Sequence, residues 1–118
     1  MLSKNFLALI TLAVTFGLVS AIPSAAPQQP CAAVHIIAAR GSVERPGPGI
    51  IGALVTQIQN ANSQTVSTEA VDYPATLTQY PSSSAQGMAA TMILLQNQVK
   101  TCPEQKLVLV GYSQVSDL

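Results

Sequence analysis

The stretch Leu107-Val108-Leu109-Val110-Gly111-Tyr112-Ser113-Gln114 decides the fold of this 118-residue chain. Its first half is an apolar run typical of a buried strand, and its second half has the spacing Gly-x-Ser-x. A nucleophile elbow begins in this way, because small residues beside the serine allow a sharp turn from a strand into a helix. The stretch therefore predicts a strand that ends in a tight turn and presents Ser113 as a nucleophile.

The elbow motif departs from its complete form at the last position. Val115 stands where a second glycine belongs, and Leu118 follows three residues later. We therefore expect a chain that is truncated before the helix after the serine. The codons GTA-AGT read Val-Ser and are also a common intron donor site, so a retained or mispredicted intron is one explanation. A genuine short product is the other.

Two further strands are expected upstream of this stretch. Val34 to Ala39 is apolar without alternation, which fits a strand buried on both faces. Val66 to Val71 alternates and contains β-branched residues, and Lys106 to Val110 is the third strand. Each is separated from the next by a segment with helical periodicity. The order strand-helix-strand-helix-strand predicts an α/β three-layer sandwich with a parallel sheet in flavodoxin-like order, as the N-terminal half of an α/β-hydrolase-like fold.

The two helical segments carry their apolar residues at regular spacing. The first runs from Ile50 to a polar end near residue 60. In the second, Ser83 and Gln86 have the spacing of a capping box at the start of the helix. Met88 and Met92 follow on one apolar stripe and are expected in the core.

The N-terminus has the pattern of a secretory signal peptide over residues 1–21. Lys4 is followed by an apolar run over residues 6–19 and by small residues suited to cleavage after Ala21. That run of about 14 residues is shorter than the ~20 that span a bilayer, so secretion is expected and a membrane anchor is the alternative. Residues 22–30, rich in Ala, Pro and Gln, are expected to be a disordered lead-in to a partial domain over 31–118.

Secretion places the two cysteines, Cys31 and Cys102, in an oxidising compartment, where a disulfide between them is expected. Closing a loop of about 70 residues would stabilise the fold by ~4 kcal/mol in the chain-entropy model. Two free thiols or an intermolecular bridge are the alternatives.

Charge and motifs exclude several function classes. Without Lys4 the chain has four basic and five acidic residues, and no basic patch that would indicate nucleic-acid binding. It shows no metal-ligand cluster and no cofactor or phosphate-binding motif, so neither a metal nor a cofactor is expected. Glu44 is expected in solvent, where it could pair with Arg45. Nothing in the sequence indicates an oligomeric state.

The loops that leave the carboxyl ends of parallel strands form the usual active-site crevice of such folds. Gly41 and Ser42 follow the first strand, and Ser113 and Gln114 follow the third. If Ser113 attacks an ester carbonyl, the developing oxyanion needs donors placed in advance. The N–H of Gln114 and the N–H and hydroxyl of Ser42 are the candidates. His35, the single histidine, lies inside the first strand and is expected to be a core residue rather than a general base.

Three motifs together resemble the cutinase and acetylxylan esterase family: Ala39-Arg40-Gly41-Ser42-Val43-Glu44, Tyr73-Pro74-Ala75 and Gly111-Tyr112-Ser113-Gln114. The resemblance covers Cys31 to Gln114 and places both cysteines where the family has its first disulfide. It implies secretion and hydrolysis of carboxylic esters in cutin, acetylated xylan or lipids. It also implies an acyl-enzyme on Ser113, with Ser42 and Gln114 as the oxyanion hole.

The chain also departs from that family. There the motif continues with a glycine after the glutamine, and the catalytic Asp and His lie further along; neither is present here. A nucleophile without its base loses orders of magnitude in rate, so we expect a serine esterase by lineage with negligible turnover. The alternatives are a non-catalytic secreted fragment that binds surfaces or polymers, and a gene-model artefact.

Overall fold

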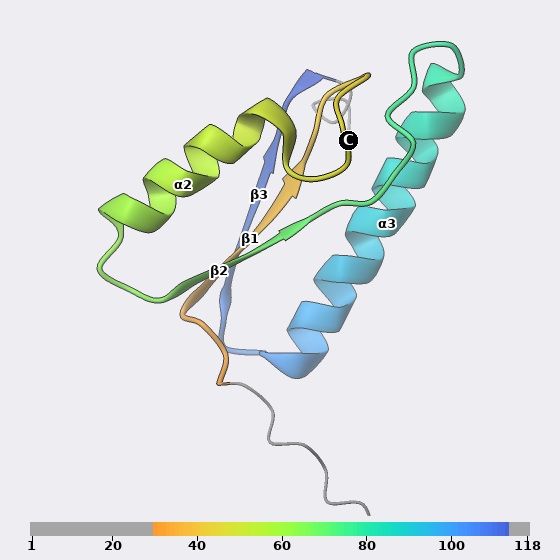
Figure 1. Cartoon of the computed structure of the whole chain (residues 1–118). Helices are drawn as coiled ribbons and strands as arrows, with labels where there is room; N and C mark the ends of the chain where they lie inside the picture. The colour runs from red at the N-terminus through yellow and green to blue at the C-terminus, as the bar shows by residue number, and fades with distance from the viewer. Residues whose placement is uncertain (1–29, 114–118) are drawn as a thin grey trace, which may run out of the picture.

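The computed structural model describes residues 30–113, which form one parallel sheet with a helix on each face (Figure 1). Strands β1 (Val34–Ala39), β2 (Val66–Ala70) and β3 (Lys106–Gly111) lie in the order β2-β1-β3. This is the start of a flavodoxin-like order, and it confirms the predicted α/β sandwich. The predicted signal peptide, the lead-in before Pro30 and Gln114 lie outside the described residues.

The two helices cover opposite faces of β1, as its alternating side chains show. Ile36 and Ala38 pack against α2 (Gly52–Ala61), which follows the short 3-10 helix η1 (Gly49–Ile51). Ile37 and Ala39 pack towards α3 (Tyr80–Thr101). Every residue of β1 is therefore buried, which explains its apolar run without alternation.

The contact between α3 and the rest of the fold differs from the sequence prediction. Met88 and Met92, expected in the core, are about half exposed. The buried residues are instead Ser83, Gly87 and Thr91, spaced four apart. Because these side chains are small, they let the helix approach the segment after β2 closely, and the larger methionines lie to the side of this stripe.

The predicted capping box is also wrong. The helix begins three residues earlier, at Tyr80, with Pro81 in its first turn, where proline is tolerated. The hydroxyl of Ser83 is buried and accepts the N–H of Thr76 at 3.0 Å. Ser83 therefore stabilises the loop before the helix rather than the helix end itself.

The expected disulfide joins Cys31 and Cys102, whose Cα atoms are 5.8 Å apart and whose sequence separation is 71. It ties the segment before β1 to the end of α3, directly ahead of β3. Among the described residues, no helix combines the length and the apolar character needed to cross a membrane.

Candidate active site

Ser113 lies two residues after Gly111, the last residue of β3, and has a backbone φ of +62°. A positive φ is uncommon for a residue with a Cβ, and such strain of about 1–3 kcal/mol persists only where the surrounding structure holds it. Nucleophile elbows place their serine in this conformation on a sharp strand-to-helix turn. The backbone of Ser113 thus has the geometry that the Gly-x-Ser-x spacing predicts.

The loop after β1 contacts this turn through Gly41. The register pairs Ala39 with Gly111, so the two strands end side by side. A Cβ placed on the buried Gly41 would lie 3.1 Å from Tyr112 Cδ1 and 3.3 Å from Ser113 Cβ. A side chain at this position would be crowded, so glycine favours this approach, which brings the neighbouring Ser42 to the edge of the sheet that holds Ser113.

The hydroxyl of Ser42 is buried and has no hydrogen-bond partner within the described part of the chain. A buried polar group without a partner costs about 1–3 kcal/mol, so native structures rarely keep one without a functional reason. A donor reserved for a substrate oxygen has this property. Gln114, the second predicted oxyanion donor, lies outside the described residues.

Two more strained residues hold the turn around Ser42. Val43 has φ +60° and Ala75 has φ +52°, and the N–H of Val43 donates to the carbonyl of Ala75 at 2.8 Å. For a β-branched residue such as valine a positive φ is a genuine outlier. The loops after β1 and β2 therefore support each other in unfavourable conformations at the same edge where Ser113 is strained.

Glu44 is half-buried, and its carboxylate binds backbone N–H groups instead of pairing with Arg45 in solvent. Its Oε2 accepts the N–H of Gly41 at 2.6 Å, and its Oε1 accepts the N–H of Ile50 at 2.8 Å. The carboxylate thus joins the two ends of the loop that contains Ser42. Sequence reasoning missed this role, although a lone acidic residue inside a loop rich in Gly and Pro was the available signal.

Arg40 and Tyr73 form a buried pair beneath this loop. The Tyr73 hydroxyl donates to the carbonyl of Arg40 at 2.5 Å, and the guanidinium donates back to the carbonyl of Tyr73. Arg40 also donates to the carbonyls of Glu44 at 3.0 Å and Val71 at 3.4 Å, and its guanidinium carbon lies 5.0 Å from the centre of the Tyr73 ring. Burial raises the pKa of the Tyr73 hydroxyl; nearby Arg40 opposes this rise and Glu44 adds to it.

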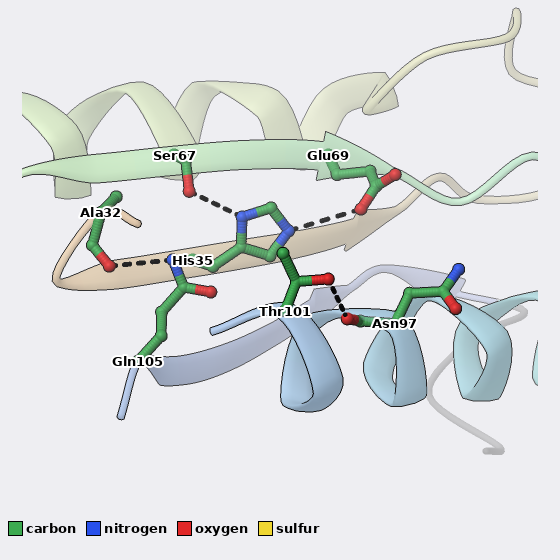
Figure 2. Close-up of polar contacts among 7 residues, drawn as sticks. All are labelled: Ala32, His35, Ser67, Glu69, Asn97, Thr101 and Gln105. Carbon is green, nitrogen blue, oxygen red and sulfur yellow. Dashed lines mark hydrogen bonds and ion pairs between the residues drawn. The ribbon is translucent and has the colours of Figure 1, made fainter. Parts of the chain in front are cut away.

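His35 lies at the other end of the sheet. Figure 2 shows its buried ring between two β2 side chains, with Nδ1 2.7 Å from Ser67 Oγ and Nε2 3.4 Å from Glu69 Oε2. Its register partner is Leu107, four residues before Gly111, which is about 13 Å along the strand at ~3.3 Å per residue. As expected, His35 is a core residue that joins two strands, out of hydrogen-bond reach of Ser113.

Within residues 30–113, no group of three or more His, Cys, Asp or Glu side chains is close enough to hold a metal ion. The described edge thus brings together the strained Ser113, the unpartnered hydroxyl of Ser42 and the loop that Glu44 closes.

Comparison with known proteins points to one family. A family model described as Cutinase matches residues 30–118. Acetylxylan esterase 2 of Talaromyces purpureogenus is 36% identical over 95 residues, which are 75% of this chain and 40% of that enzyme. The chain spans at most about half the length of this and other curated relatives it matches.

Solved structures agree with this result. An acetylxylan esterase structure at 0.90 Å resolution matches with a TM-score of 0.68 and 37% identity, over 72% of this chain and 44% of that one. The Trichoderma reesei cutinase in complex with a C11Y4 phosphonate inhibitor matches with a TM-score of 0.64 and 30% identity, over 90% of this chain and 48% of that one.

Proposed function

This chain belongs to the cutinase family, and on that premise we propose that it is a secreted carboxylic ester hydrolase whose Ser113 forms the acyl-enzyme. The relatives it matches are ester hydrolases. The observation that carries the proposal is the juxtaposition of Ser113, at φ +62°, with a loop whose Ser42 hydroxyl is buried and unpartnered. Esters of cutin, acetylated xylan or short lipids are the substrate classes proposed.

The proposed reaction uses the described edge of the sheet. The Oγ of Ser113 attacks the ester carbonyl carbon, its proton passes to a base, and the carbonyl electrons move onto the oxygen. The hydroxyl and N–H of Ser42 and the N–H of Gln114 donate to that oxyanion. Collapse expels the alkoxide, which takes up a proton, and leaves the acyl group on Ser113. Water then attacks the acyl-enzyme and releases the acid.

The base cannot be the histidine of this sequence, because His35 is its single histidine and is buried far from Ser113. A serine site without its histidine keeps only the contribution of its oxyanion hole and of substrate binding. We therefore propose that the 118 residues supply the nucleophile and the oxyanion hole, and that the proton acceptor is external to them.

Added imidazole can replace the absent base and so test this proposal. We would measure hydrolysis of p-nitrophenyl acetate and p-nitrophenyl butyrate by the purified chain over a range of imidazole concentrations. The matched control is Ser113→Ala, which also corrects for hydrolysis by imidazole alone. The proposal predicts a rate above that control that grows with imidazole. Equal rates for both proteins would refute it, and binding to insoluble cutin or xylan that survives Ser113→Ala would then favour a non-catalytic role.

A further inference from the structure

We propose that Glu44 is a positioning residue for ester hydrolysis: its carboxylate holds the loop after β1 closed, so that Ser42 keeps its position in the loop that contacts Ser113 through Gly41. This inference rests on the proposed function. It assigns the residue through which the fold controls the oxyanion hole.

The loop is built around the carboxylate of Glu44. One oxygen accepts the N–H of Gly41 at 2.6 Å and the other accepts the N–H of Ile50 at 2.8 Å, so a single side chain closes the loop at both ends. Gly49 has φ +66°, and a Cβ placed there would lie 2.2 Å from Glu44 Oε2. The carboxylate therefore fills space that any other residue at position 49 would need.

The residues on both sides of Ser42 are each held by a hydrogen bond from their backbone N–H. Gly41 is held by Glu44, and Val43 is held by the carbonyl of Ala75 despite its positive φ. A strained turn persists only when several contacts determine it together. If the contact at Gly41 is lost, the turn can relax, and the Ser42 hydroxyl moves away from Ser113.

Both carboxylate oxygens of Glu44 accept hydrogen bonds from backbone N–H groups. Within residues 30–113, no Lys or Arg side chain forms an ion pair with Glu44, and Arg40 bonds its backbone carbonyl instead. Hydrogen bonds from N–H groups to an ionised carboxylate are short and about twice as strong as neutral ones. A neutral amide cannot replace both bonds, because only one of its two end atoms accepts.

Glu44→Gln tests the proposal in the imidazole-supported assay. Removing an oxyanion donor lowers kcat by ~10²–10³ in a serine hydrolase, so a displaced donor should lower the Ser113-dependent kcat at least ~10-fold. The KM should stay within about twofold, since the displaced hydroxyl donates to the oxyanion of the transition state rather than to the bound ester. Glu104→Gln, which removes the same charge from an exposed turn, should leave kcat unchanged.

A double-mutant cycle separates positioning from simple stabilisation. In a Ser42→Ala background, Glu44→Gln should lower kcat by no more than about twofold, because the hydroxyl it positions is absent. An equal effect of Glu44→Gln in both backgrounds, or no effect in either, would overturn the positioning role. If Glu44→Gln does not fold, Glu44→Asp takes its place. Its side chain is one methylene shorter, which withdraws the carboxylate from the N–H of Gly41, so the same Ser42-dependent loss is expected.

The two proposals fail in different ways. If the unmodified chain shows no Ser113-dependent rate, the proposed function is wrong and the positioning role falls with it. If that rate exists and Glu44→Gln leaves it unchanged, only the role of Glu44 is wrong.

Discussion

Replacing Gly87 by alanine in the middle of α3 sets two effects of opposite sign against each other. Alanine is favoured over glycine inside a helix by about 1 kcal/mol. The new Cβ, however, would lie 2.9 Å from Cδ2 and 3.2 Å from Cε2 of the Tyr73 ring, closer than carbon atoms pack. Overpacking of a well-filled core typically costs 1–3 kcal/mol.

The position of Tyr73 decides which effect is larger. Tyr73 is 5% exposed, its hydroxyl donates to the carbonyl of Arg40, and its own carbonyl accepts from the Arg40 guanidinium. The ring cannot move aside without breaking these contacts, so the overpacking cost lies in the upper part of its range. We expect Gly87→Ala to lower the free energy of unfolding by about 1–2 kcal/mol net of the helix gain.

The free energy of unfolding is measured by equilibrium unfolding in urea, monitored by circular dichroism. The melting temperature is measured separately by thermal unfolding. A loss of about 1–2 kcal/mol corresponds to roughly 5–15 °C for a domain of this size. Ala89→Gly, at an exposed position of the same helix, measures the propensity effect alone and should cost about 1 kcal/mol. If Gly87→Ala is as stable as the parent or more stable, the close contact with Tyr73 does not constrain the fold as argued.

Two further predictions concern the disulfide and pH. Replacing Cys31 and Cys102 together by serine should lower the free energy of unfolding by about 4 kcal/mol. The reason is that the unfolded chain regains the conformational entropy that a cross-link between residues 71 apart removes. A urea midpoint unchanged from that of the oxidised parent would contradict this prediction. The raised pKa of Tyr73 means that folding favours its protonated form, so this stabilisation is complete below pH 10 and is lost as the pH rises through the folded-state pKa. The melting temperature should therefore fall more steeply above pH 10 in the parent than in Tyr73→Phe, and parallel curves would refute the assignment.

The central strand and the strand order could be predicted because they depend on the burial of β1 and on the helical crossovers. β1 is central and covered on both faces, so its sequence is apolar except for His35, and the helical crossovers indicate parallel pairing. The nucleophile turn was equally visible, since Gly111 and Ser113 stand at the end of an apolar run. The predicted burial of that run was wrong, because no residue of β3 is fully buried and Leu109 is 54% exposed. These features depend on local patterns that a single sequence displays.

The packing of α3 could not be predicted in the same way. Helical periodicity is recognised from the spacing of large apolar residues, and for this reason Met88 and Met92 were predicted to lie in the core. The helix instead approaches through Ser83, Gly87 and Thr91, whose small size matters only once the neighbouring Tyr73 is in place. The role of Glu44 was hidden for a related reason, because its partners are backbone N–H groups that no side-chain pattern shows.

The most direct test of the central claim is a search for a covalent adduct on Ser113. Because the related T. reesei cutinase was solved with a phosphonate inhibitor, the purified chain would be incubated with a fluorophosphonate probe and imidazole. Intact mass and peptide mapping would then locate the label. The account predicts one phosphonyl group on Ser113, and none after Ser113→Ala. An unlabelled chain, or a label on another residue that persists in Ser113→Ala, would contradict it.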